Sequence, residues 1–179
     1  MKKIVLAIAC LTVMISCDKN ENSSTTGEVS KVEIEFTKNG ELEFLNANGE
    51  SIRRINIEIA DTPNKRARGL MDRSQMAEDN GMLFIFDDSE IRKHTFYMKD
   101  TRIPLDIMYF DKDSVLINIA SNAQPGADSE LSPGGTVAAA AADSKFVVEI
   151  NGGLAETWGI KEGETKIRWN QNKIFYIYI

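Results

Sequence analysis

Most apolar residues of this chain fall in short runs or alternations, separated by turn residues. Ile55, Ile57 and Ile59 alternate with polar residues, a pattern typical of a half-buried strand. Residues 82–86 form a continuous apolar run, which is typical of a fully buried strand. Many short strands with one or two short helices predict a mainly β fold, either an antiparallel β-sandwich or a partly closed barrel.

The same patterns predict the remaining elements. Asn48-Gly49 indicates a tight turn between two early strands, so the chain is expected to open with an antiparallel meander. Thr62-Pro63 predicts the start of a short helix that ends near Gly69. A helical turn is expected at residues 154–158, a long loop at 121–135 and a packed coil or helical turn at the alanine run 138–142. Further strands are predicted at residues 32–36, 42–45, 95–98, 105–110, 115–119, 146–150, 165–169 and 174–179.

The N-terminus indicates export. A short basic start is followed by an apolar segment at residues 4–15, which is too short to span a bilayer because a spanning helix needs about 20 residues. The segment ends Met14-Ile15-Ser16-Cys17, which resembles the lipobox of bacterial lipoproteins, with Met14 where Leu is usual. We interpret residues 1–16 as a lipoprotein signal peptide and Cys17 as the lipidation site. The alternative is an ordinary secretory signal that is cut elsewhere.

This interpretation sets the domain organisation. The polar stretch at residues 17–28 is expected to be a flexible tether rather than an ordered coil, and residues 29–179 a single β-rich domain. Cys10 lies in the removed peptide, so the mature domain has no thiol for a disulfide, a metal or catalysis. The expected partner is a membrane, contacted through lipid on Cys17. The expected location is the cell envelope, facing the periplasm or the surface.

The charge balance excludes some partners. The formal net charge of the chain is -6, and removal of Lys2 and Lys3 makes it more negative. An acidic protein is a poor nucleic-acid binder, because affinity for the phosphate backbone depends on basic residues. We therefore expect no nucleic-acid partner, and no basic patch for anionic lipid.

Three blocks in one stretch carry a family resemblance. They are Arg66-Ala67-Arg68-Gly69-Leu70-Met71-Asp72-Arg73, then Gly81-Met82-Leu83-Phe84-Ile85-Phe86, then Phe96-Tyr97-Met98-Lys99-Asp100-Thr101-Arg102-Ile103-Pro104-Leu105-Asp106-Ile107. The chain resembles the domain of unknown function family 192, an uncharacterised family of bacteria and archaea, over residues 55–167. Tyr97 replaces the family's usual Trp, and Asp100 its usual Asn. The resemblance implies a mostly antiparallel β-sandwich of jelly-roll type and no known activity.

Polar residues within these blocks form a candidate ligand site. If the predicted helix packs beside the corner at residues 99–106, two arginines face two carboxylates, and an arginine can grip a small anionic or polyhydroxylated ligand bidentately. The alternative is structural: Asp106 accepts hydrogen bonds from loop amides, and an arginine pairs with Asp106 or Asp100 and ties the helix to the sheet. The candidate ligand-binding residues are Arg66, Arg73, Lys99, Asp100, Thr101 and Asp106.

Catalytic motifs are scarce. His94 is the chain's one histidine, and no nucleophile-elbow motif is present. Without clusters of His and Cys, we expect no metal site and no cofactor. The sequence favours a non-enzymatic domain that binds a small ligand or a protein partner. The alternatives are a hydrolase-like enzyme that uses Asp100 or Asp106 with Lys99 and the arginines, and a purely structural envelope component.

Overall fold

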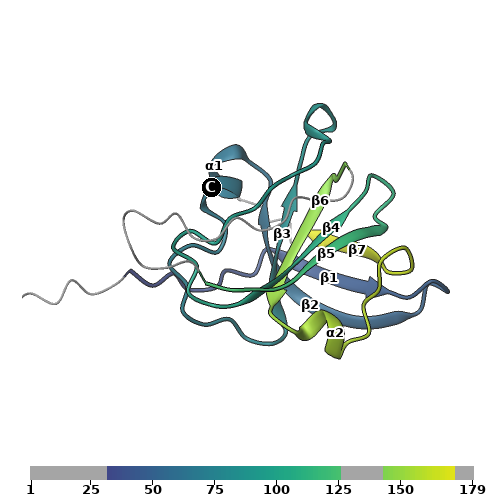
Figure 1. Cartoon of the computed structure of the whole chain (residues 1–179), viewed down its shortest axis with the longest axis horizontal. Coiled ribbons are helices and arrows are strands. Elements are labelled where there is room, and N and C mark those ends of the chain that lie inside the picture. The colour runs from purple at the N-terminus through teal and green to yellow at the C-terminus, as the bar shows by residue number, and fades with distance from the viewer. Residues whose placement is uncertain (1–31, 126–142, 172–179) are drawn as a thin grey trace, which may run out of the picture. The chain divides into compact units, whose positions relative to one another are not determined.

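The structure is a computed structural model that describes residues 32–125 and 143–171 (Figure 1). Several predictions lie outside the described residues. They are the signal peptide, the Cys17 lipidation site, the tether, the alanine run, the strand at 174–179 and most of the loop at 121–135. The start of that predicted loop was wrong, because residues 121–123 continue a strand. None of the helices in the described ranges has the length and apolarity that crossing a membrane requires.

Seven strands form one mixed sheet in the order β5-β4-β6-β3-β2-β1-β7. The prediction of a mainly β fold is therefore confirmed. Neighbouring strands are antiparallel except β2 and β3, which run parallel. The strands are β1 (Gly40–Leu45), β2 (Ser51–Ala60), β3 (Asn80–Ile85), β4 (Leu105–Phe110), β5 (Leu116–Ala123), β6 (Phe146–Asn151) and β7 (Lys166–Gln171).

The parallel pair is connected through the helix α1 (Pro63–Arg68). The Thr62 hydroxyl accepts the Lys65 amide at 3.4 Å, and Pro63 occupies the first turn, where a missing N–H costs nothing. Gly69 ends the helix at φ 48°. The sequence prediction of this helix and both of its ends is confirmed. The other helices are the 3-10 turn η1 (Asp88–Glu90) and α2 (Leu154–Thr157).

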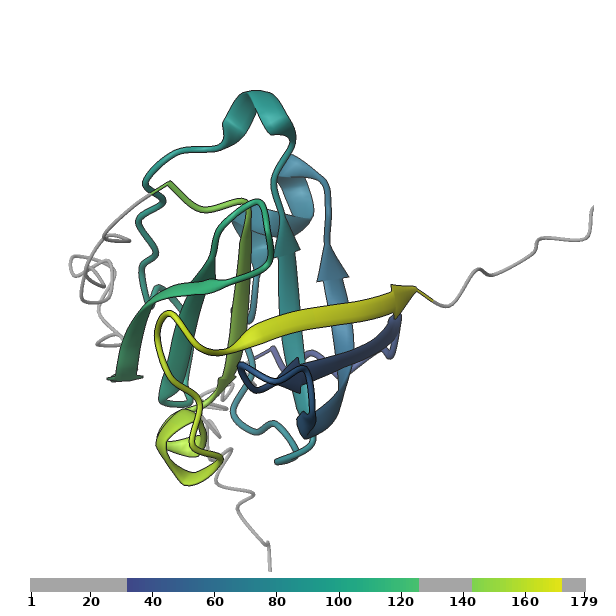
Figure 2. The same cartoon turned by 90° about the vertical axis from the view of Figure 1, so that its right-hand side faces the viewer.

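The sheet curls until its two edge strands meet at one corner. The Leu116 amide donates to the Thr165 carbonyl at 2.8 Å, and the Ile167 amide donates to the Ser114 carbonyl at 3.1 Å. Val115 and Lys166 form the only β-bridge between the two edges among the described residues. Figure 2 shows β7 running across the other strands. The sheet is thus an open barrel that is joined at one corner and not closed.

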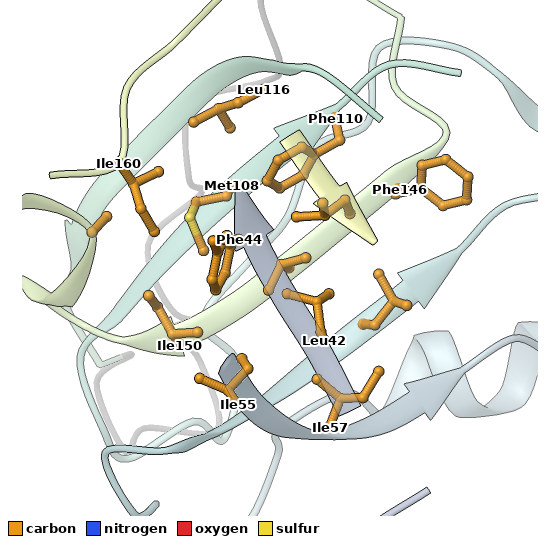
Figure 3. Packing of buried hydrophobic residues seen from close by; sticks show 14 of the residues in the cluster. Leu42, Phe44, Ile55, Ile57, Met108, Phe110, Leu116, Phe146, Ile150 and Ile160 are labelled. Carbon is orange, nitrogen blue, oxygen red and sulfur yellow. The ribbon is translucent and has the colours of Figure 1, made fainter. Parts of the chain in front are cut away.

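Each face of the sheet carries its own apolar cluster. The concave face encloses Leu42, Phe44, Met108 and Phe110 together with Ile150 (Figure 3). Alternation along the strands sends the other set to the outer face, where residues 70–76 and 96–103 cover it. Members of the outer cluster include Leu70, Met82, Phe84, Met98, Ile107, Tyr109 and Val147.

Two predicted strands are wrong. Residues 32–36 are extended but join no sheet, because the Ile34 amide donates to the Asp72 carbonyl and the Glu33 carboxylate accepts the Ser74 amide and hydroxyl. Residues 95–98 form no strand in the part of the chain that the structure describes, although Tyr97 is a single bridge residue, and Phe96 packs edge-on against Phe84. In both segments, the alternation of apolar and polar residues reflects packing of one side of the segment against the domain, and not pairing in the sheet.

Candidate functional site

Two loop segments, residues 70–76 and 96–103, cover the outer face, and backbone hydrogen bonds connect one segment to the other. The Asp72 amide donates to the Asp100 carbonyl at 2.8 Å, and the Arg102 amide donates to the Arg73 carbonyl at 3.2 Å. Asp100 has φ 53°, a left-handed conformation that Asn and Asp adopt most easily among non-glycine residues. This conformation explains why the Asn that is usual in the resembled family can be replaced by Asp at this position.

Asp106 accepts backbone hydrogen bonds, as the structural interpretation of the sequence expects. Its Oδ1 accepts the Asn122 amide at 2.7 Å and its Oδ2 accepts the Ala155 amide at 2.8 Å. Asp106 is 0% exposed and faces away from the outer covering. Its carboxylate ties β5 and the start of α2 to β4, so it is part of the scaffold in this structure.

The two candidate arginines pair with glutamates, not with Asp100 or Asp106. Arg66 donates to Glu90 at 2.7 Å and to the Ile85 carbonyl at 2.9 Å. Arg73 forms a buried pair with Glu58 at 2.6 Å. Arginines of the helical segment therefore do contact the sheet, as the structural alternative predicted, but the predicted partners Asp100 and Asp106 were wrong.

The other candidates lie around a surface turn. Lys99 and Asp100 are both exposed and approach each other at 3.9 Å, a distance at which a surface pair contributes little. Thr101 is buried and its hydroxyl donates to the Lys99 carbonyl at 3.3 Å. Of the six candidates, only Arg66 and Thr101 line a common pocket.

This pocket lies between the outer face and its covering segments and has a volume of about 240 Å³. Most of its wall is apolar or aromatic, and arginine side chains contribute as well. We call it the Glu149 pocket. Its lining residues are 66–71, Phe84, Phe86, Arg92, 94–97, Thr101 and Glu149.

Glu149 is the polar group that the sheet itself contributes to this pocket. It lies on β6, and its neighbours on the adjacent strands are Met82 and Ile107, both buried. Glu149 is 5% exposed and pairs with no cation in the described ranges. Burial raises the pKa of its carboxyl to about 8. Glu149 is therefore neutral at pH 7 and can donate a hydrogen bond.

His94 is a second buried polar group of the pocket. Its ring stacks on Phe86 with a centroid distance of 3.6 Å, and the residue is 6% exposed. Its Nε2 has no hydrogen-bond partner among residues 32–125 and 143–171. Burial, followed by the nearby charge of Arg92, lowers the pKa of His94 below its ordinary value. The imidazole is therefore neutral at pH 7.

Sequence reasoning missed Glu149 and Arg92 as site residues. A usable signal existed for Glu149, because a carboxylate interrupts the apolar strand Phe146-Val147-Val148-Glu149-Ile150. Arg92 gave no signal, because its place at the pocket depends on tertiary packing. Within the part of the chain that the structure describes, no group of three or more His, Cys, Asp or Glu residues is placed to hold a metal ion.

Comparison with known proteins identifies relatives without assigning an activity. A sequence model described as "Uncharacterized ACR", the domain of unknown function family 192, matches residues 44–169. A crystal structure of a protein of unknown function from Novosphingobium aromaticivorans is 33% identical, with a TM-score of 0.62. That match covers 72% of this chain and 84% of the other.

A second crystal structure, of a putative transcription regulator from Sinorhizobium meliloti, is 29% identical, with a TM-score of 0.63. It covers 77% of this chain and 98% of the other. Among curated proteins, none matches this chain. The comparisons thus agree on the fold and leave the chemistry to be argued from the pocket.

Proposed function

Because this chain belongs to the domain of unknown function family 192, whose activity is uncharacterised, we propose a function from its own geometry. We propose that the protein is an envelope lipoprotein whose domain binds a small polar or anionic ligand in the Glu149 pocket. The observation that carries this proposal is a buried, unpaired carboxyl that lines an aromatic-walled cavity.

Energetics support a binding role for Glu149. A buried polar group without a partner costs about 1–3 kcal/mol, and a charged one costs more. By contrast, the buried carboxyl of Asp106 accepts two backbone amides. An unpaired buried carboxyl that destabilises the fold in this way is typical of a binding site, where a ligand supplies the missing hydrogen bond.

The alternative functions have weaker support. A hydrolase would need Asp100 or Asp106 as an acid or base, but Asp106 holds two backbone amides and Asp100 is exposed beside Lys99. A role in transcription regulation, the description given to the Sinorhizobium protein, finds no support here as direct DNA binding, because the net charge of this chain is -6. A purely structural role leaves the unpaired Glu149 without a reason.

A thermal-shift screen of the full chain tests ligand binding. The probes are glucose, glucuronate, phosphate, benzoate and divalent metal ions, and a bound probe at a hundredfold excess over its Kd stabilises the fold by about 2.7 kcal/mol. Thr95→Trp places a large side chain at an exposed position of the pocket wall, and Ser89→Trp does the same outside it. A shift that disappears only in Thr95→Trp supports the proposal. A shift that survives in Thr95→Trp places the binding elsewhere.

Labelling with radioactive palmitate tests the anchor separately. We expect label in the chain and its recovery with the membrane fraction. Cys17→Ser removes the predicted acceptor, whereas Cys10→Ser changes only the predicted signal peptide. Label that persists in Cys17→Ser rules out lipidation at this residue.

A further inference from the structure

The Glu149 carboxyl is available to a guest molecule. Its side chain shares the outer face with Val147, and its cross-strand neighbours Met82 and Ile107 offer no polar partner. No described residue forms a hydrogen bond or ion pair with this carboxyl, and it lines the pocket, so its hydrogen-bonding capacity is free for a molecule in the cavity. Any molecule that fills the pocket has to present a polar atom to this carboxyl.

The walls of the pocket favour a flat guest. Phe84 and Phe96 meet edge to face with a centroid distance of 5.1 Å, and Phe86 and His94 stack in parallel. Tyr97 is 49% exposed, which is unusual for so large a side chain. Aromatic rings prefer such offset and edge-on partners, so a planar ring gains contact on several sides.

One cation of the pocket is left for an anionic group. Arg66 is occupied by Glu90, and Arg68 by Asp72 at 2.6 Å. Arg92 is exposed and forms no ion pair with any residue in the described ranges. A carboxylate beside Arg92 would gain a charge-assisted hydrogen bond without displacing an existing pair.

We propose that the Glu149 pocket binds a small aromatic acid, with its ring among Phe84, Phe96 and Tyr97, its carboxylate at Arg92 and a ring hydroxyl or carbonyl at Glu149. This inference rests on the proposed function, because it names the ligand class of the same site. A sugar carries a hydroxyl on nearly every carbon and needs many polar partners. Several polar side chains of the pocket are already engaged, since Arg66 and Arg68 form ion pairs and the Thr101 hydroxyl donates to a backbone carbonyl.

The protonation of Glu149 gives the inference a measurable signature. Burial raises the pKa of this carboxyl to about 8, so at pH 7 it donates to the ligand, and above pH 8 it is an anion that repels an aromatic acid. If only the protonated form binds, affinity falls about tenfold between pH 7 and pH 9.

No other group that faces Glu149 and has a resolved pKa shift titrates in this interval. The pKa of Tyr109 on β4 is raised above its ordinary value, mainly by burial and also by Glu149. The pKa of His94 on the covering segment is lowered. The charged side chains at the pocket besides Glu149 are Arg66, Arg68 and Arg92, and β3 contributes only Met82 and Phe84.

Isothermal titration calorimetry of the full chain with 4-hydroxybenzoate tests the inference. We expect binding at pH 7 that weakens about tenfold at pH 9. Arg92→Gln should weaken binding at least about tenfold, as loss of a charged hydrogen bond does. Lys93→Gln, an exposed neighbour outside the pocket, is the control and should leave affinity unchanged. Glu149→Gln keeps a donor without a titrating proton, so it should bind equally at both pH values.

The comparison ligands separate the inference from the proposed function. Cyclohexanecarboxylate and glucuronate carry the same carboxylate on non-aromatic rings and should bind more weakly than 4-hydroxybenzoate. If glucuronate or phosphate binds through Arg92 and Glu149 while 4-hydroxybenzoate does not, the ligand class is wrong and the binding function stands. If no probe binds any folded variant at either pH, both proposals fail.

Discussion

At the residue scale, the fold holds two buried carboxyls in different ways. Asp106 on β4 receives two backbone amides, whereas Glu149 on β6 lies among apolar side chains. Asp106 is therefore stabilised by the structure around it. Glu149 is instead destabilised in its charged form, as its raised pKa of about 8 records.

The free energy of unfolding should depend on pH through Glu149. Because the folded state binds this proton up to about pH 8 and the unfolded state releases it from the ordinary pKa of 4.5, stability falls across this interval and levels off above it. At 1.36 kcal/mol for each pKa unit, the loss over this interval is roughly 5 kcal/mol. Glu149→Gln should remove this loss in urea denaturation at a series of pH values. Parallel curves for both proteins would contradict the prediction.

Asp106→Ala should strongly destabilise the fold. The substitution leaves the Asn122 and Ala155 amides without acceptors, and a hydrogen bond to a charged group contributes about 1.5–3 kcal/mol. We expect a loss of about 3 kcal/mol or more in chemical denaturation. Asp113→Ala, at an exposed turn, should change stability by less than about 0.5 kcal/mol. Equal effects of the two substitutions would show that the Asp106 bonds are dispensable.

The candidate site could be predicted only in part from single residues. The blocks around Arg66 and Thr101 point to the correct side of the sheet, and both residues line the pocket. Glu149 is some 50 residues away from Thr101 in the chain, and only strand pairing brings it to the same cavity. A sequence shows which residues are polar, but it does not show which of these side chains become buried in the folded protein.

At the element scale, strand length and apolar pattern were sufficient to locate most strands. The runs at 105–110 and 146–150 coincide with β4 and with all but the last residue of β6. The predicted opening meander was partly wrong, because residues 32–36 join no sheet, although β1 and β2 pair antiparallel as expected. The parallel pairing of β2 with β3 through the crossover helix α1 was not predicted. Pairing direction depends on where the chain returns, and the apolar pattern carries no such information.

The close approach of β3 and β6 gives an element-scale prediction. A Cβ atom at Gly81 would lie 2.7 Å from the Glu149 carbonyl oxygen and 3.0 Å from Ile55 Cδ1. Gly81→Ala should therefore push the two strands apart and cost about 1–3 kcal/mol, as overpacking of a core does. Thermal unfolding measures the loss. A variant as stable as the wild type would show that the strands yield freely.

At the scale of the whole domain, the corner bridge predicts uneven protection of the β7 edge. The Ile167 amide donates to the Ser114 carbonyl across the corner. Alternation along β7 turns the Trp169 amide to the same edge, where it donates to no backbone carbonyl of the described residues. Amide hydrogen exchange should be slow at Ile167 and much faster at Trp169. Similar protection at both residues would contradict an edge that is open beyond the corner.

The order of the strands could not be read from the sequence. The partly closed barrel was one of two expected architectures, and the corner between β5 and β7 favours it. However, β7 pairs with β1 from the opposite end of the domain, and β6 lies between β3 and β4. Such pairings join residues far apart in the sequence and depend on the packing of the complete core. A local sequence pattern therefore does not predict them.

The backbone bonds between Asp72 and Asp100 and between Arg73 and Arg102 have a kinetic consequence. These hydrogen bonds connect the two segments that line the Glu149 pocket, so we expect neither segment to move independently of the other. A ligand then enters a pocket that is already open, and binding requires no slow conformational change. Its observed association rate should rise in proportion to its concentration and show no plateau, as for a preformed site.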